Sequence, residues 1–360
     1  MDTNLKPRVV VGLSGGVDSS VAAALLLGRG YDVAGLFMRN WKEKDENGRC
    51  TAETDFFDVK RVAAVLGIDY YAADFSEEYW DRVFVAFVEE YKKGGTPNPD
   101  VLCNREIKFG PFAERAKKMG ADYIATGHYA ATEVLDGLTF LKKAKDKSKD
   151  QTYFLNQLNQ AQLTNVLFPL GGLLKAEVRE LAKKYGLAVA EKKDSTGICF
   201  IGERKFREFL ANYIPSKPGD IVTEDGRVVG RHSGVCYYTV GQRRGLGLGG
   251  DSLSQSEGRW FVVKKDVQNN LLYVCRGDDG IIYGKELYCS GFNFITLRPQ
   301  KNTLRVFARI RHRQPEQAAV AEFDGDRLHL VFDQPQRAIA SGQYAVLYDG
   351  EYCIGGGVIE

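Results

Sequence analysis

The sequence predicts an α/β protein with a doubly wound parallel sheet at its N-terminal end and a mostly β C-terminal part. Two observations lead to this prediction. Up to about residue 212, short β-branched runs alternate with stretches of helical periodicity, which is typical of a parallel sheet with helices on both faces. Beyond that point, hairpin signals of the Asp-Gly type replace the helical periodicity.

The N-terminal alternation begins with a strand at 7–13, a Gly/Ser-rich loop at 14–20 and a helix-forming run at 21–27. The elements that follow are a strand at 31–38, a helix near 55–66, a strand near 68–73, helices near 77–92 and 112–118, and a strand at 122–126. This order is that of a doubly wound sheet.

Asp-Gly pairs mark the C-terminal part, where they separate runs of alternating polarity at 225–226, 279–280, 324–325 and 349–350. Glycine-rich or polar stretches at 245–258 and 277–284 are natural loops or domain boundaries. We therefore expect three domains, covering 1–212, 213–283 and 284–360.

Composition excludes several classes of protein. The 49 Lys and Arg nearly balance the 47 Asp and Glu, so the net charge is +2 and nucleic-acid binding would need local basic patches. Apolar runs such as 21–27 are far shorter than the roughly 20 residues that span a bilayer, and no secretion signal is visible. The seven cysteines form no CxxC pair, which indicates a reducing cytosol and argues against a zinc ribbon. We expect a cytoplasmic protein without a membrane segment or a bound metal.

The first loop has the features of a phosphate site. Its sequence is Gly12-Leu13-Ser14-Gly15-Gly16-Val17-Asp18-Ser19-Ser20, and it joins the first strand to the first helix, where backbone amides and the helix dipole hold anions. This loop contains neither GxxxxGK[ST] nor GxGxxG. The two serines offer hydroxyl donors, and the aspartate can orient magnesium or the loop itself. A plain glycine-rich turn is the alternative interpretation.

This loop resembles the PP-loop of the N-type ATP pyrophosphatases, which include GMP synthetase, argininosuccinate synthetase and tRNA thiolases. The resemblance implies that ATP is cleaved between its α and β phosphates to give an adenylated substrate and pyrophosphate. The rest of the chain has to indicate which substrate is adenylated.

Two cysteines stand out from the other five. Cys103 follows the proline-containing stretch 94–99, and Cys199 lies in the polar segment 194–203. Arg105 and Lys108 near the first, and Lys192, Lys193 and Arg204 near the second, favour the reactive thiolate. Four others lie in apolar, strand-like runs and are interpreted as buried small side chains, namely Cys236, Cys275, Cys289 and Cys353.

Longer motifs make the resemblance more specific. GLSGGVDSS, NPDxLCNxxIKF, DYIATGHY, SKDQTYFL, KDSTGICFIGERKFREFL and GQRRGLGLGG are similar in order and spacing to those of the tRNA-specific 2-thiouridylase family, and the similarity extends to the terminal GGGVIE. It implies a PP-loop domain of the adenine nucleotide alpha hydrolase type, a small central domain and a C-terminal β-barrel. The implied reaction is the 2-thiolation of the wobble uridine in the tRNAs for lysine, glutamate and glutamine.

The resemblance also implies a mechanism. ATP, with Mg²⁺, adenylates the uridine 2-oxo group, and Cys199 carries a persulfide loaded by a cysteine desulfurase or a sulfur-relay protein. Cys103 either releases hydrosulfide from that persulfide or closes a disulfide after the persulfide has attacked, and the sequence does not separate the two. Asp100 is the candidate general acid or base, with a turn-capping role as the alternative. An iron–sulfur cluster on Asp100, Cys103 and Cys199 ranks below the persulfide route.

Site residues follow from the same resemblance. The loop from Gly12 to Ser19, together with Met38 and Gly127, is implied to bind ATP. His128 is implied to contact tRNA, although a satisfied core histidine is the alternative. The other implied tRNA contacts are Asn98, Pro99, Asp100, Lys149, Asp150, Gln151, Arg311, His312 and Gln343. Many members of the family carry tyrosine where this chain has His312, which puts an aromatic stack there in doubt, although histidine also stacks on bases.

Three basic stretches could contact tRNA phosphates. The segment 142–151 holds five lysines, and 242–245 is a basic turn, although such runs are often only solvated. In the strand-like run 305–313, period-two spacing predicts an outer row of arginines over an inner apolar face. Two rivals remain: another PP-loop enzyme that adenylates a small molecule, such as an amidating synthetase, and a non-catalytic, nucleotide-sensing RNA-binding protein. We expect a monomeric thiolating enzyme.

Overall fold

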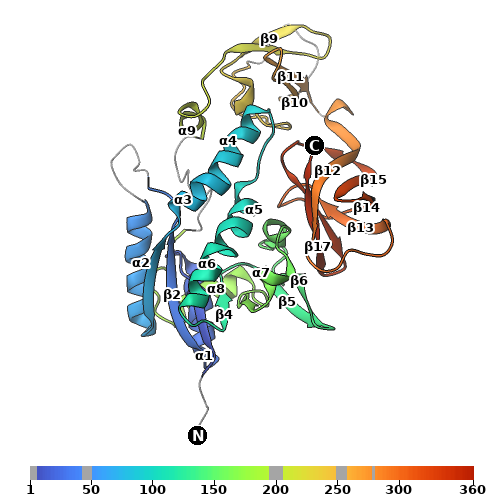
Figure 1. The fold of residues 1–360 in the computed structure, drawn as a ribbon. Coiled ribbons are helices and arrows are strands. Elements are labelled where there is room, and N and C mark those ends of the chain that lie inside the picture. The colour runs from blue at the N-terminus through green and yellow to red at the C-terminus, as the bar shows by residue number, and fades with distance from the viewer. Residues whose placement is uncertain (1–5, 43–50, 194–205, 249–257, 278–279) are drawn as a thin grey trace.

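The computed structural model describes residues 6–42, 51–193, 206–248, 258–277 and 280–360 (Figure 1). Its N-terminal sheet has five strands in the order β3-β2-β1-β4-β7, and all neighbours pair in parallel. The strands are β1 (Arg8–Gly12), β2 (Asp32–Arg39), β3 (Asp69–Asp74), β4 (Tyr123–Ala125) and β7 (Val166–Leu167). The predicted parallel sheet is confirmed.

Helices cover both faces of this sheet, as the valine run of β1 requires. Val9 and Val11 pack with Leu26 of α1 and Val59 of α2, whereas Val10 faces the opposite cluster, which includes Phe112 of α6. Burial on both faces explains why β1 is continuously apolar rather than alternating. The helices of the N-terminal part are α1 (Val17–Gly28), α2 (Thr51–Leu66), α3 (Ser76–Tyr79), α4 (Val85–Lys92), α5 (Pro99–Cys103), α6 (Pro111–Lys118), α7 (Gln160–Leu163) and α8 (Lys175–Lys184).

Two π-helical turns interrupt the helical stretches. Residues Trp80–Phe84 join α3 to α4, so the predicted helix near 77–92 is one helical segment with a π turn inside it. Residues Asn104–Lys108 continue α5 in the same way, and π turns of this kind are frequent at functional sites. A 3₁₀ turn, Thr152–Leu155, lies close to α5.

A hairpin leaves the N-terminal part and joins the C-terminal sheet. Strands β5 (Ala130–Leu135) and β6 (Leu138–Lys143) turn at Asp136 and Gly137, which both have positive φ. β6 then pairs with the barrel strand β17 through Lys142 and Leu141. The lysine-rich segment 142–151 therefore begins inside a strand, since Lys142 and Lys143 are the last residues of β6.

The central part is a four-stranded sheet in the order β10-β11-β8-β9. Its strands are β8 (Gly219–Val222), β9 (Val228–His232), β10 (Trp260–Asp266) and β11 (Leu271–Arg276), and helix α9 (Phe206–Ala211) precedes them. The predicted Asp225-Gly226 turn connects β8 to β9, with Gly226 at φ 81°.

The C-terminal part is a closed six-stranded barrel, as predicted. The order is β12-β15-β14-β13-β16-β17, and β12 pairs again with β17 to close the sheet. The tight turns at Asp324-Gly325 and Asp349-Gly350 lie between consecutive strands and place glycine at positive φ. The strands are β12 (Tyr283–Phe294), β13 (Thr303–Arg309), β14 (Gln317–Asp324), β15 (Arg327–Arg337), β16 (Tyr344–Asp349) and β17 (Tyr352–Ile359).

The predicted inner apolar face of 305–313 is confirmed, since Val306, Ala308 and Ile310 are buried. The predicted outer row holds for the exposed Arg305 and Arg313, but Arg311 is half-buried and Arg309 is buried. Arg305 lies at the surface and pairs with Asp333, but β13 ends at Arg309, whose side chain is only 8% exposed. Arg309 donates to Asp150 at 2.7 Å and to Glu316 at 2.7 Å, because segment 144–155 covers this end of the barrel.

In the part of the chain that the structure describes, no helix is both long and apolar enough to cross a bilayer.

We predict that Arg309→Met destabilises the fold far more than Arg305→Met, a matched change on the same strand. The first change leaves the fully buried carboxylate of Asp150 without its ion pair, which costs about 3–5 kcal/mol. The second removes an exposed pair that solvent screens, so the free energy of unfolding should hardly change. Urea denaturation of both variants measures this difference, and equal midpoints would contradict the structural role of the buried pair.

Candidate active site

The glycine-rich loop has the geometry of an anion site, and it lies at the carboxyl edge of the parallel sheet. It joins β1 to α1, and Gly16 caps α1 without a side-chain hydrogen bond, so the first-turn amides face the loop. Ser19 Oγ accepts from the Ser14 amide at 3.2 Å and lies 3.1 Å from Ser14 Oγ. The two hydroxyls and the helix N-terminus therefore converge, which is the geometry that holds a phosphate.

Two glycines are required by close backbone contacts. A Cβ on Gly127 would lie 2.6 Å from the Ser19 amide nitrogen, and one on Gly15, whose φ is 72°, would lie 2.4 Å from the Asp55 carbonyl. A Cβ on Gly12 would lie 3.7 Å from the Met38 side chain. The structure therefore brings Gly12, Ser19, Met38 and Gly127, which sequence reasoning assigned to ATP, to one place at the end of β1 and β4.

Asp18 already has its charge balanced within the protein. Lys175, the first residue of α8, donates to both carboxylate oxygens at 2.7 and 2.8 Å, and the Tyr129 hydroxyl donates at 2.9 Å. Of the two roles left open for Asp18, this arrangement favours orientation of the loop over metal binding. Sequence reasoning missed Lys175, since the two residues are 157 positions apart and no local pattern links them.

Lys192 contacts the loop from the other side. Its ammonium donates to the Gly15 carbonyl at 3.0 Å and to Asp55 and Asp58 of α2 at 2.9 and 2.8 Å. It was predicted to act as a cation near Cys199. Cys199 lies within 194–205, outside the described residues, so the structure places Lys192 at the PP-loop and leaves its relation to that cysteine as a prediction.

Cys103 lies at the end of α5 and is completely buried, among side chains such as Val101 and Ile107. Cys103 comes just after the proline-containing stretch, as the sequence indicated, but the expected setting of a reactive rather than a buried thiol differs from the structure, because the helix that begins at Pro99 turns the side chain into the core. Asp100 lies one turn before Cys103 on the same helix and is partly buried. An acid and a thiol three positions apart share one helix face, so Asp100 keeps its candidate role.

The two predicted cations beside Cys103 contact other groups. Arg105 pairs with Glu106 at 2.6 Å and donates to Gln157 at 3.1 Å, while the Lys108 ammonium lies 3.5 Å from His128 Nε2. The last contact connects the Cys103 helix with the end of β4 that carries Gly127.

Among the residues that the structure describes, no group of three or more His, Cys, Asp or Glu could hold a metal ion. The iron–sulfur ligand set suggested from the sequence, Asp100, Cys103 and Cys199, includes a cysteine that lies outside the described residues.

His128 is buried and bonded within the protein. Its Nδ1 lies 2.7 Å from the Thr126 hydroxyl, and its ring packs between Phe109 and Phe168. Burial, with a smaller contribution from Lys108, lowers the pKa of His128 well below its ordinary value, so the ring is neutral at pH 7. This geometry favours the core-histidine interpretation, and contact with tRNA stays a prediction.

Of the four cysteines that were expected to be buried, three are. Cys275, Cys289 and Cys353 lie on strands, and burial raises the pKa of the Cys289 thiol to about 12. Cys236 differs, because it is half-buried in a 3₁₀ turn with its Sγ 3.9 Å from the Lys92 carbonyl.

Two of the residues predicted to contact tRNA, His312 and Gln343, fasten the barrel to the N-terminal part. His312 Nε2 lies 3.0 Å from the Asp150 carbonyl, and its ring packs on Phe154 with centroids 4.3 Å apart. The Gln343 side chain donates to the Thr96 carbonyl at 2.6 Å, two residues before Asn98. The other internal contacts are from Arg311 to the Val240 and Ala338 carbonyls and from the Tyr129 amide to Gln151.

The lysine-rich segment is less positive than its sequence indicates. Four of its five lysines pair with glutamates: Lys142 with Glu133, Lys143 with Glu316, Lys145 with Glu177 and Lys147 with Glu351. These ion pairs favour the alternative of a structured, solvated segment over a free phosphate-binding patch. Lys149, Asp150 and Gln151 keep their predicted tRNA role only as a proposal.

Three protein families match successive parts of the chain and define the class of protein to which it belongs. The family "tRNA methyl transferase HUP domain" matches residues 7–203, the family "tRNA methyl transferase PRC-barrel domain" matches 207–276, and the family "Aminomethyltransferase beta-barrel domain" matches 284–359. The chain is thus a HUP-domain protein with a PRC-barrel and a C-terminal β-barrel.

Curated relatives then identify the family. The chain is 52% identical to the tRNA-specific 2-thiouridylase MnmA of Alkaliphilus oremlandii over 98% of its own length and 97% of the relative's. It is 54% identical to that of Geobacillus thermodenitrificans (98% and 94%) and 53% to that of Pediococcus pentosaceus (100% and 97%). The chain belongs to the tRNA-specific 2-thiouridylase family, as its motifs predicted. The domain descriptions mention methyl transfer, but the near full-length matches decide the family.

We predict that Cys103 resists alkylation in the free protein. Its thiol has no exposed surface, so iodoacetamide should modify it as slowly as it modifies the barrel residue Cys289. In denaturing urea both should react quickly. Peptide mass spectrometry separates the individual cysteines, and labelling of Cys103 in the folded protein much faster than of Cys289 would show that α5 opens without tRNA.

Proposed function

We propose that this protein uses ATP to convert the wobble uridine of the tRNAs for lysine, glutamate and glutamine into 2-thiouridine. The observation that carries most weight is the identity of more than 50%, along almost the whole chain, with relatives named tRNA-specific 2-thiouridylase. The geometry adds support, because the phosphate-binding loop and the Cys103 helix meet through Lys108 and His128.

The loop supplies the adenylation step in this proposal. The amides at the start of α1 and the hydroxyls of Ser14 and Ser19 would hold the ATP phosphates while the uridine 2-oxo oxygen attacks the α phosphorus. The bond to the β-phosphate oxygen breaks and pyrophosphate leaves. Because Asp18 is already paired with Lys175, Mg²⁺ would arrive with the ATP phosphates rather than be held by Asp18.

Sulfur then replaces the adenylated oxygen. A desulfurase or a relay protein loads Cys199 as a persulfide, sulfur attacks carbon 2, and AMP leaves with the former 2-oxo oxygen. In one route the Cys103 thiolate attacks Cys199 Sγ and releases hydrosulfide, which is the attacking species. In the other, the persulfide attacks first and Cys103 then displaces the sulfur from Cys199. Both routes end with a Cys103–Cys199 disulfide that an external thiol must reduce.

The burial of Cys103 adds a requirement to this chemistry. A thiol with no exposed surface cannot reach another sulfur until α5 or the residues packed against it move. We infer that tRNA binding causes that movement, and we also expect the segment around Cys199 to rearrange when tRNA binds. A cytoplasmic monomer that takes sulfur from a desulfurase or relay protein remains part of this proposal.

The decisive experiment combines the protein, ATP, Mg²⁺, a cysteine desulfurase with cysteine, and unmodified glutamate tRNA, followed by nucleoside mass spectrometry. We expect 2-thiouridine with the wild-type protein and none above background with Cys199→Ser or Cys103→Ser. Cys236→Ser, at a half-buried thiol outside the site, is the matched control and should keep the activity. Formation of AMP and pyrophosphate without thiouridine would point to a small-molecule synthetase, and thiouridine from both serine variants would refute the sulfur route.

We also predict that Gly127→Ala weakens ATP binding about tenfold or more, which is about 1.4 kcal/mol. The added methyl would lie 2.6 Å from the Ser19 amide nitrogen and would push the β4 end away from the loop. Gly172→Ala, at a glycine with open space around its Cα, is the matched control. Isothermal titration with ATP tests both, and equal affinities would remove Gly127 from the nucleotide site.

A further inference from the structure

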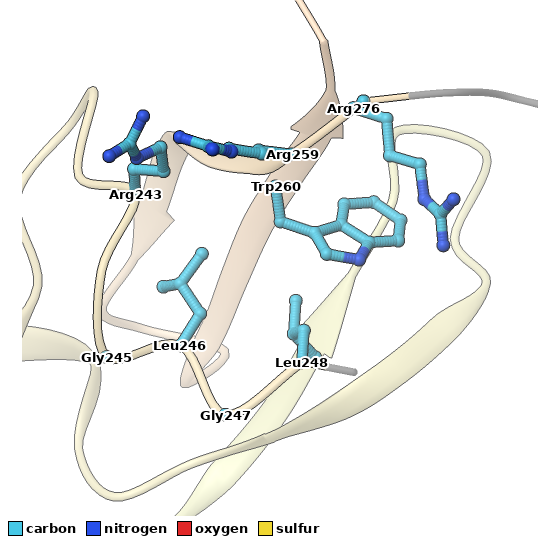
Figure 2. A pocket seen from close by; sticks show the side chains of 9 residues that line it. Arg243, Gly245, Leu246, Gly247, Leu248, Arg259, Trp260 and Arg276 are labelled. Atoms are coloured by element: carbon cyan, nitrogen blue, oxygen red, sulfur yellow. The ribbon is translucent and has the colours of Figure 1, made fainter. Parts of the chain in front are cut away.

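A basic pocket of about 390 Å³ lies in the central part of the chain, at the far end of the molecule from the N-terminal sheet (Figures 1 and 2). Its walls are a glycine-rich loop at 243–248 and the facing ends of β10 and β11. Arg243, Arg259 and Arg276 contribute its charge, and Leu246, Leu248 and Trp260 form its apolar side. The basic turn 242–245, which the sequence offered as one possible contact for tRNA phosphates, supplies Arg243, and the proposed mechanism gives the assembled pocket no role.

The charge of the pocket is of one sign. No aspartate or glutamate is among the described residues that line it. Arg243 and Arg259 are exposed to solvent, and Figure 2 shows their guanidinium groups directed toward one another at the same rim. Arg276 lies over the Trp260 ring, with its guanidinium carbon 4.6 Å from the centroid. Two converging guanidinium groups match the oxygens of a phosphate better than lysines do.

The loop that carries Arg243 is held in place before any ligand binds. Gly241 and Gln242 pair with Val262 of β10 through hydrogen bonds of 2.7 and 3.0 Å. The Gln242 side chain accepts from the Thr239 amide and donates to the Arg244 carbonyl. A rigid loop loses little conformational entropy on binding, so its arginine costs less to fix than one on a free loop.

Helix α9 connects the pocket with the catalytic part of the sequence. Arg207 of α9 donates to the Gly245 carbonyl at 2.9 Å, and its guanidinium lies 4.5 Å from the centre of the Tyr238 ring. Arg207 is only eight residues beyond Cys199 in the sequence. A ligand in the pocket therefore binds beside the helix that ends the Cys199 segment.

We propose that this pocket binds a backbone phosphate of the tRNA, with the attached ribose against Leu246 and Leu248. This inference rests on the proposed function, which supplies an RNA substrate, and it adds a contact site remote from the PP-loop. Through Arg207 and α9, RNA held there is fixed relative to the chain that leads to Cys199. The pocket thus gives affinity and orientation, not base specificity.

The test compares the double variant Arg243→Gln, Arg259→Gln with Arg231→Gln, a control on the exposed part of β9 in the same sheet. Filter binding of unmodified glutamate tRNA is measured at several salt concentrations. We expect the double variant to bind about tenfold or more weakly, and the slope of log K against log salt to fall by about 1 to 2, since each lost phosphate contact contributes about 0.7–0.9. The control should bind like the wild type.

Unchanged affinity and slope in the double variant, with an unchanged melting temperature, would overturn the proposal. A second arm titrates AMP and inorganic phosphate into the tRNA-free protein. If these bind in a way that depends on Arg243 and Arg259 while tRNA affinity does not, the ligand is a free phosphate compound and the RNA assignment is wrong. Failure of the proposed function looks different, because the wild-type protein would then neither thiolate nor bind tRNA.

Discussion

The buried ion pair between Asp150 and Arg309 is the interaction that positions the rest of the molecule. Removing two charges from water costs free energy, and the cost is offset only when each charge has a partner. Here Glu316 also pairs with Arg309, and Lys143 pairs with Glu316. One member comes from the barrel strand β13 and another from the segment after β6. The pair therefore holds the C-terminal barrel in one orientation relative to the N-terminal part. The pairing of β6 with β17 is a second connection between the two.

The barrel in turn fixes the Cys103 helix. The Tyr153 hydroxyl donates to the Tyr344 carbonyl, and the Gln157 side chain donates to the Gly356 carbonyl, so segment 150–158 lies firmly on the barrel. On its other side this segment accepts a hydrogen bond from Asn104 at the Phe154 carbonyl. At the start of α5, Thr96 bonds with Ser341 and Gln343. The helix is thus held on one side by the barrel itself and on the other by segment 150–158, which the barrel holds in place.

Local patterns predicted the parts of the structure that local physics determines. A continuous valine run such as β1 is stable only in a strand that is buried on both faces. Glycine is required where φ is positive or where the backbone approaches a neighbour closely, and Asp-Gly pairs favour the tight turns of hairpins. Interactions across long sequence separations had no such signal. Alternation along 305–309 separates two faces of a strand, but it does not say that segment 144–155 covers one of them and buries Arg309. The same limit explains the missed partners Asp18–Lys175 and the burial of Cys103, whose neighbours come from many separate elements.

The PP-loop is held by two lysines that lead to different parts of the chain. Lys175 connects Asp18 to α8, and Lys192 connects the Gly15 carbonyl to α2 immediately before the segment that carries Cys199. Phosphate binding at the loop brings negative charge close to both ammonium groups and competes for them with Asp18, Asp55 and Asp58. Lys192 is only seven residues before Cys199 in the sequence. Under the proposed function, the nucleotide site and the sulfur carrier are therefore linked by charge as well as by sequence.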